Sequence, residues 1–347
     1  EETKSLEFGT DLGFLNERLG FVLTYYESET INQIMGVQIP RAGGYEEQML
    51  NAGDVQNKGW ELLLRASPFR SPTGFSWDLT LNWAKNTSEV TELFGDLETL
   101  VLGTYWSVNI EARIGEPYGA LFGNPELRCG VTEDPAYDGI CAGNEGLLIL
   151  NASGDTQVDP TRRVLGNYTP DWNAGLQSRF TLGRWSLNTL LQGQRGGDIF
   201  SVTDYFGQYA GVLEKSIPGR EVDWDDPGVL VRGVLPDGTI NGEGGNDVRV
   251  LAQDYYEGVW GKHDRSILDA SYLKFRELRI AYELPTSIAS WMGFNGGSVA
   301  LIGRNLFLWS KATDIDPETA FDASNAQGIE FGQHPSVRSL GFAITLY

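Results

Sequence analysis

The stretch FSWDLTLNWAKN, residues 75–86, alternates apolar and polar side chains more cleanly than the other segments of the chain. The apolar set is Phe75, Trp77, Leu79, Leu81 and Trp83, and the polar set is Ser76, Asp78, Thr80 and Asn82. Successive side chains of a β-strand point to opposite faces. The pattern therefore predicts a strand with one apolar and one polar face.

The same alternation recurs along the chain, for example in LGFVLTYY (19–26), NKGWELLLRA (57–66), DWNAGLQSRF (171–180) and RWSLNTLLQGQ (184–194). In DASYLKFRELRIAYELP (269–285), the apolar positions are Leu278, Ile280, Tyr282 and Leu284, and Pro285 ends the strand. Nine strands are predicted, near residues 3–14, 19–33, 57–68, 75–92, 171–181, 184–199, 271–284, 297–309 and 337–347.

The connections between these strands alternate in length. Those after the first, third, fifth and seventh strands are short or medium, and those after the second, fourth, sixth and eighth are long. Two of the long ones reach about 70 residues, well beyond an ordinary loop. This is the pattern of an antiparallel up-and-down transmembrane β-barrel with short periplasmic turns and long extracellular loops. SVNIEARI (107–114) is a candidate for a further barrel strand inside a long connection.

The aromatic residues of 75–86 support a membrane barrel. Phe75 and Trp83 are separated by about 26 Å along a strand, or about 20 Å along the membrane normal when the strand is tilted. That spacing matches the two aromatic girdles of an outer-membrane barrel. The alternative is a soluble secreted β-sandwich, such as a lectin, with the rings in its core.

The composition restricts the possible partners and compartment. The net charge of −21 argues against nucleic acid and against docking on an anionic membrane surface. Cys129 and Cys141 flank a Gly- and Asp-rich segment without a CxxC motif, which predicts a disulfide and an oxidising compartment; two free thiols are the alternative. The odd strand number and the lack of a signal peptide at Glu1 lead us to expect the tail of a larger barrel, since bacterial barrels close with an even number.

Several stretches resemble the SusC/RagA type of TonB-dependent outer-membrane transporter. They are EETKSLEFGTDLGFLNERLGFVLTYY, NAGDVQNKGWELLL, RRVLGNYTPDWNAGL, DASYLKFRELRIAYELP, GRNLFLWSKATDIDPE and SVRSLGFAITLY, in the family's order. The resemblance extends from residue 1 to residue 347 and implies the C-terminal portion of a probably 22-stranded barrel, without the plug domain, the TonB box and the earlier strands. Barrels of this type end on an aromatic residue in phase with the apolar face. Because Tyr347 is out of phase, the native chain is expected to continue by about one residue, a Phe.

The resemblance implies active import of large nutrients, glycans or oligopeptides, across the outer membrane of a Gram-negative bacterium. It also implies a SusD-like lid lipoprotein and energy supplied by TonB, ExbB and ExbD through a part outside this chain. A barrel that does not transport, and acts as an adhesin or structural protein, is the alternative.

The chain carries no enzyme motif: His263 and His334 are far apart, and neither sits in an HExxH, Cys/His or GxSxG pattern. We therefore expect no catalytic residue and no cofactor. A structural Ca²⁺ is a weaker hypothesis for the alternating carboxylates Asp314, Asp316 and Glu318. A solvated acidic loop is the commoner outcome, as for TEDPAYDG with Glu133, Asp134 and Asp138.

Aromatic side chains in the long connections are candidates for substrate contact, because exposed rings can stack on sugars or on peptide side chains. They are Tyr105, Trp106, Tyr205, Phe206, Tyr209, Trp224 and Trp260, with Tyr255 and Tyr256 as further members. The alternative is that these rings pack inside folded loops. Polar strand residues predicted to face the lumen are Asp78, Asn82, Gln192, Gln194, Arg195, Glu277 and Arg279.

Overall fold

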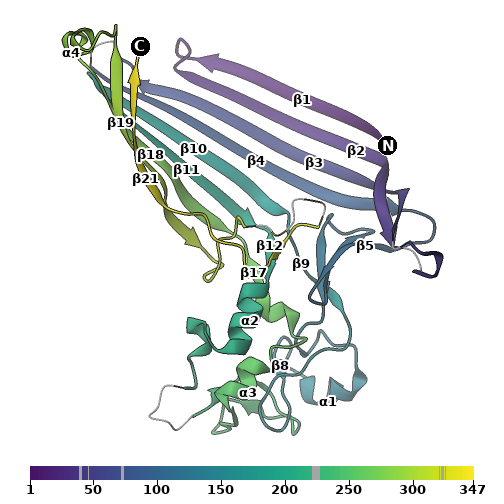
Figure 1. Ribbon diagram of the computed structural model, residues 1–347. Coiled ribbons are helices and arrows are strands. Elements are labelled where there is room, and N and C mark those ends of the chain that lie inside the picture. Colours follow the sequence, from purple (N-terminus) through teal and green to yellow (C-terminus); the bar gives the residue numbers. More distant parts are fainter. Residues whose placement is uncertain are drawn as a thin grey trace.

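The computed structural model describes residues 1–38, 41–45, 47–71, 74–220, 227–319, 321, 324 and 326–347. Its main element is a nine-stranded sheet in the order β1-β2-β3-β4-β10-β11-β18-β19-β21, with all neighbours antiparallel (Figure 1). The strands are β1 (Glu2–Phe14), β2 (Leu19–Gln38), β3 (Glu47–Phe69), β4 (Phe75–Leu93), β10 (Pro170–Leu182), β11 (Trp185–Gly196), β18 (Tyr272–Glu283), β19 (Gly297–Ser310) and β21 (Ser339–Leu346). β1 and β21 are its edges, so the nine strands form an open, curved sheet.

These strands correspond one to one with the nine predicted from the alternation. The largest difference is at the start of β3, which begins at Glu47 rather than near residue 57. β2 and β3 continue to pair as far as Gln38 and Glu47, where the clean alternation has already ended. Backbone pairing therefore extends the two strands beyond the segment that a side-chain pattern can identify.

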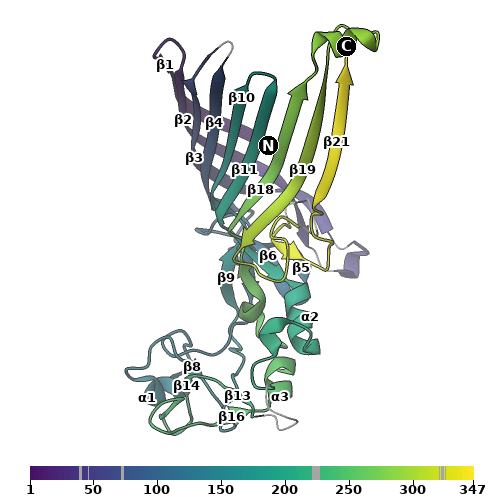
Figure 2. The same cartoon turned by 90° about the vertical axis from the view of Figure 1, so that its left-hand side faces the viewer.

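The ends of the sheet differ in the length of their connections (Figures 1 and 2). At the end drawn uppermost, the strands are joined by residues 15–18, 70–74, 183–184 and 284–296, the last of which contains helix α4 (Thr286–Trp291). At the opposite end the connections are 39–46, 94–169, 197–271 and 311–338. Three of the four connections predicted to be long are long in the fold. The connection after β2 is not, because β3 begins at Glu47; residues 39–46 form a shorter connection than residues 284–296, so the predicted alternation is present only in part.

The strand register separates an apolar face of the sheet from a polar one. One row across five strands is entirely apolar: Leu81, Leu176, Leu191, Phe275 and Phe307. A row on the opposite face is polar: Asp78, Arg179, Asn188 and Arg279. Leu278, Ile280 and Tyr282 lie on the apolar face, as the alternation predicted, because they pair with Thr189, Leu187 and Trp185.

A β-bulge in β18 shifts this alternation partway along the strand. The register changes between Phe275 and Glu277, which leaves Arg276 without a directly paired residue. A bulge places two consecutive side chains against one partner residue, so Arg276 and Glu277 can both lie on the polar face. Tyr272, Lys274 and Arg276 are consequently brought to the same face as Glu277 and Arg279.

The long connections fold into a body at one end of the sheet (Figure 2), and Leu100 and Ala112 of this body share a core with Val55 and Val90 of the sheet. The strands of this body are β5 (Thr99–Tyr105), β6 (Val108–Arg113), β7 (Ala120–Gly123), β8 (Leu148–Ile149), β9 (Arg163–Asn167), β12 (Asp198–Ser201), β13 (Val229–Leu230), β14 (Gly233–Val234), β15 (Ile240–Asn241), β16 (Arg249–Val250), β17 (Ile267–Asp269) and β20 (Ile329–Glu330). Its helices are α1 (Asp138–Cys141), α2 (Val202–Ala210) and α3 (Ala252–Glu257), with short 3-10 turns at Pro135–Tyr137, Glu214–Ser216 and His263–Ser266; a further turn, Arg41–Gly43, belongs to the β2–β3 connection.

The segment SVNIEARI does form a strand, β6, but this strand is not part of the nine-stranded sheet. It belongs to a four-stranded sheet in the order β5-β6-β7-β9. Val108, Ile110 and Ala112 are fully buried there, so its alternation reflects the core of the body rather than a membrane face.

Three long connections share one hydrophobic core within the body. Val108 and Leu121 come from the 94–169 connection, Phe200 and Tyr205 from 197–271, and Ile329 from 311–338. The three connections therefore stabilise one another rather than folding as independent loops.

The predicted disulfide is present between Cys129 and Cys141, with Cα atoms 5.1 Å apart. Cys129 is buried with Leu127, Ile149 and Val234 in a smaller core. Among the described residues, no helix is both long and apolar enough to cross a membrane.

Candidate functional site

The polar face of the sheet collects most of the residues predicted to line the lumen. Asp78 lies opposite Arg179 and Asn82 opposite Gly175, while Gln192 and Gln194 lie opposite Lys274 and Tyr272. Glu277 and Arg279 lie on the same face, where Glu277 pairs with Arg304 at 3.0 Å.

Arg195 differs from this set. It pairs with Trp172, in phase with Ala174 and Leu176, so the register puts it on the apolar face near the end of β11. Gln194 and Arg195 are consecutive and must point to opposite faces of a regular strand. Gln194 and Arg195 therefore lie on opposite faces of the sheet, and only Gln194 shares the polar face with the other predicted residues.

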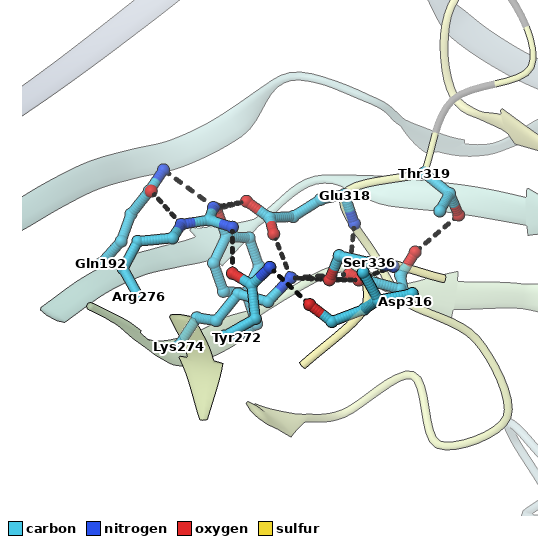
Figure 3. Close-up of polar contacts among 10 residues, drawn as sticks. Gln192, Tyr272, Lys274, Arg276, Asp316, Glu318, Thr319 and Ser336 are labelled. Carbon is cyan, nitrogen blue, oxygen red and sulfur yellow. Dashed lines mark hydrogen bonds and ion pairs between the residues drawn. The ribbon is translucent and has the colours of Figure 1, made fainter. Parts of the chain in front are cut away.

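A cluster of charged and polar side chains fixes both ends of the 311–338 connection to the polar face of β18 (Figure 3). Lys274 is only 1% exposed, and its Nζ donates to Asp316 Oδ2 at 3.0 Å and to Ser336 Oγ at 2.6 Å. Glu318 accepts from Lys274, from Arg276 and, at 2.9 Å, from the Tyr272 hydroxyl. We call Tyr272, Lys274, Arg276, Asp316, Glu318 and Ser336 the Lys274 cluster.

The acidic members of the cluster are held in their charged form. Burial would raise the pKa of Asp316, but hydrogen bonds from Ser336 and Lys274 outweigh it and the pKa is lowered. For Glu318, burial is likewise outweighed by hydrogen bonds from Arg276, Lys274 and Tyr272, and the pKa is lowered. Each buried charge therefore has a partner of opposite sign.

This arrangement bears on the hypothesis of a calcium ion at Asp314, Asp316 and Glu318. Asp316 and Glu318 already bind cationic side chains of the chain itself. In the described ranges, no three His, Cys, Asp or Glu side chains are arranged to hold a metal. Asp314 instead lines a neighbouring pocket of about 580 Å³ together with Lys274, Asp316 and Arg338. A calcium ion here stays a prediction, and it would have to displace Lys274.

Most of the aromatic residues predicted to contact substrate gather in one cluster. Trp106 lies 4.8 Å from Phe206 and 6.3 Å from Trp260 between ring centroids, and Trp260 lies 5.0 Å from both Tyr205 and Tyr209. Trp106, Tyr209 and Trp260 are 45%, 42% and 39% exposed. We call Trp106, Phe206, Tyr209, Trp260, Phe321 and Phe331 the aromatic patch.

Phe321 and Phe331 belong to this patch but were not predicted from the sequence. Their rings lie 5.1 Å apart, and Phe331 lies 6.4 Å from Trp106. Both come from the 311–338 connection, whereas Trp106 comes from the 94–169 connection. The sequence around a single Phe in a polar loop does not show that the ring will contact an aromatic residue of another connection. That contact arises only when the connections fold together.

Other predicted aromatic residues have different roles. Tyr205 is 1% exposed and its hydroxyl accepts from the Gly261 N–H, so it supports the patch from the core. Tyr105 packs edge-on against Phe321 at 5.4 Å. The rings of Tyr255 and Tyr256 meet edge-on at 5.1 Å, and they lie beneath Arg265 and Arg220, respectively. Trp224 lies outside the described residues.

Trp106 occupies an unusual backbone position. It forms the two-residue turn between β5 and β6 with Ser107, and both have positive φ, 51° and 70°. Such turns favour Asn and Gly, because a side chain in the left-handed region costs conformational energy. Trp106 and Ser107 are both unfavourable in such a turn. The exposed Trp106 ring is therefore present for a reason other than the stability of the turn.

His263 lies beneath the patch and is buried. Its Nδ1 accepts from the Asn124 N–H at 3.0 Å, and its ring stacks at 6.1 Å on Tyr205. Burial, reinforced by the nearby Arg162, lowers the pKa of His263 to about 4. The neutral ring is therefore a structural part of the body.

Acidification is expected to destabilise the body through His263. Between pH 6.5 and about 4 the unfolded chain binds a proton at His263 that the folded chain does not, so stability falls as the pH falls. The slope contributed is at most about 1.4 kcal/mol per pH unit. His263→Gln should flatten the dependence of the melting temperature on pH in this window. His334→Gln, at the other and exposed histidine, should leave it unchanged, and an equal slope in both variants would contradict the assignment.

A sheet with one apolar and one polar face, short turns at one end and a folded body at the other, has the pattern of a transmembrane β-barrel wall. Residues 1–228 match the family described as TonB dependent receptor-like, beta-barrel, and the chain belongs to this family. Family membership points to an outer-membrane protein of a Gram-negative bacterium.

Individual relatives agree with this family. TonB-dependent receptor P26 of Formosa agariphila is 24% identical over 371 residues, covering 100% of this chain and 34% of that receptor. TonB-dependent receptor SusC of Bacteroides thetaiotaomicron is 34% identical over 96 residues, covering 27% of this chain and 10% of SusC. The RagAB peptide transporter superposes with a TM-score of 0.71 at 19% identity, covering 99% of this chain and 35% of that one.

The predicted resemblance to SusC/RagA-type transporters is thereby confirmed. The named relatives are receptors and transporters rather than enzymes. The chain spans about a third of the length of the relatives that it matches from end to end.

Proposed function

We propose that this chain is the C-terminal barrel portion of an outer-membrane importer of large nutrients, either glycans or oligopeptides. The complete barrel would have 22 strands around a plug domain, with the long connections outside the cell. A SusD-like lipoprotein would cover the outer opening, and TonB, ExbB and ExbD would supply energy through the plug. The family and the similarity to SusC and RagAB support this proposal.

The observation that carries a binding role is the aromatic patch. Its rings come from three separate connections and stay partly exposed although a core is available directly beneath them. Aromatic faces bind the apolar faces of sugars and the side chains of peptides, so the patch suits both substrate classes. The polar face of the sheet would then line the path inward, with Asp78, Asn82, Gln192 and Arg279 among its side chains.

The test uses the complete protein with its lid lipoprotein, in cells and in detergent. Binding of defined oligopeptides and of defined oligosaccharides is measured by calorimetry, and uptake is measured with and without TonB. TonB-dependent uptake of one of the two classes supports the proposal. Binding without uptake would overturn it and support an adhesin or structural barrel instead, since the exposed patch could serve that role as well.

Replacing Trp106 by glycine should separate binding from folding. Glycine suits the left-handed turn, so the gain in backbone energy offsets the lost ring contacts and stability should change by less than about 1 kcal/mol. Loss of an exposed stacking platform should weaken substrate binding about tenfold. Calorimetry and thermal melting provide the two readings.

The control is Trp291→Gly, which removes another exposed Trp at the opposite end of the molecule. It should not alter substrate affinity. Unchanged affinity in the Trp106 variant would show that the patch does not contact the substrate.

A further inference from the structure

The apolar face of the sheet contains a groove near the short-connection end. Its volume is about 330 Å³, and its lining includes Trp185, Tyr282, Val299, Phe342 and Ile344. Every lining residue is apolar or aromatic.

The register explains how the groove forms. Trp185, Tyr282, Val299 and Ile344 lie in one row across β11, β18, β19 and β21. The Trp185 and Tyr282 rings stand 4.8 Å apart on one side, and Ile344 stands on the other. Val299 has the smallest side chain of the four and lies between Tyr282 and Ile344, so it forms the bottom of the groove. In the next row, Leu301 lies between Ile280 and Phe342.

The connection beside the groove is suited to a lipid interface. No charged residue occurs from Leu284 to Gly303. Helix α4 lies in this stretch, and Ile288, Trp291 and Met292 are 45%, 86% and 37% exposed at helical spacing. Exposed Trp beside uncharged backbone is typical of the boundary between acyl chains and headgroups.

We infer that the groove binds one acyl chain of a phospholipid from the leaflet at the short-connection end, with α4 at the level of its headgroup. The groove is continuous with the apolar face that meets the membrane, so its occupant must come from the hydrocarbon region. A flexible chain can enter a hollow of this shape, and the contact removes apolar surface from both partners. The inference rests on the membrane placement in the proposed function, but not on import or on its substrate.

The experiment is native mass spectrometry of the complete protein, purified from its own membrane or reloaded with a phosphatidylethanolamine. The wild type should retain a phospholipid through delipidation. Val299→Trp fills the groove and Ile344→Ala removes one wall, and each should lower retention about tenfold. Trp291→Ser should lower it by a smaller factor, because only the headgroup contact is lost.

Leu81→Trp is the matched control, since it adds the same ring to the same apolar face outside the groove. It should retain lipid as the wild type does. Heat-dependent migration on gels confirms folding of each variant. Equal retention in Val299→Trp and the wild type, equal loss in Leu81→Trp, or no lipid on the wild type would each overturn the inference. Uptake measured in parallel distinguishes its failure from a failure of the proposed function.

Discussion

Replacing Lys274 by methionine should destabilise the protein by about 3–5 kcal/mol. Methionine has a similar length but no charge, so Asp316 and Glu318 would lose a buried cation while their own charges remain. Leaving a buried charge unpaired costs far more than an exposed ion pair contributes. The segment around Asp316 should also detach, which hydrogen exchange of residues 312–319 would detect together with a lower melting temperature.

Lys311→Met provides the control. Lys311 pairs with Asp269 at 2.6 Å, but their side chains are 67% and 39% exposed, so solvent screens the pair. Its replacement should cost less than about 1 kcal/mol and leave exchange of residues 312–319 unchanged. Similar losses in the two variants would mean that the Lys274 cluster is not what holds this segment.

Replacing Glu330 by alanine should cost about as much, roughly 3–5 kcal/mol. Glu330 is 1% exposed, and its carboxylate accepts from the Ser201 and Thr203 hydroxyls, both at 2.6 Å, and from the N–H groups of Thr203 and Gly332. Ser201 also caps α2, and the helix N-terminus favours the negative charge. Alanine would leave the buried Ser201 hydroxyl and the half-buried Thr203 donors without this acceptor. Thermal melting, with hydrogen exchange of α2, measures the loss.

Glu243→Ala is the matched substitution at an exposed position. Glu243 pairs with Arg232, and the side chains are 49% and 66% exposed. The expected cost is under about 1 kcal/mol. If Glu330→Ala were as mild, its hydrogen bonds could not be what fixes β20 against α2.

Much of the sheet could be predicted from the sequence, because a strand with one apolar and one polar face alternates along most of its length. Residues 75–86 and 184–194 follow this alternation at most positions, which was enough to identify both faces, although Thr189 lies on the apolar face and Leu190 on the polar one. The face of Arg195 could not be predicted in this way. Arg195 lies near the end of β11, where a polar side chain no longer indicates the polar face of the sheet. The bulge at Arg276 was equally invisible, since one extra residue shifts the phase without changing the composition.

The site was predictable only in part. Exposed rings in long connections marked Trp106, Phe206, Tyr209 and Trp260, yet not that they would meet, nor that Phe321 and Phe331 would join them. The Lys274 cluster was missed because its partners lie about forty residues apart on separate elements. DIDPE suggested a calcium site, which stays a prediction; in the structure, Asp316 and Glu318 pair with Lys274 of the same chain.

The common core of the three long connections restricts how this protein can diversify. Val108, Phe200 and Ile329 belong to one core. If one connection were replaced by that of a relative, its side chains would have to pack against the two unchanged connections, which fit only the replaced one. Recombination between relatives should therefore succeed when residues 94–169, 197–271 and 311–338 are transferred together, and fail when they are transferred singly. The three connections would thus be exchanged as one unit, together with the strand ends that pack against them, such as Met35, Val55 and Val90.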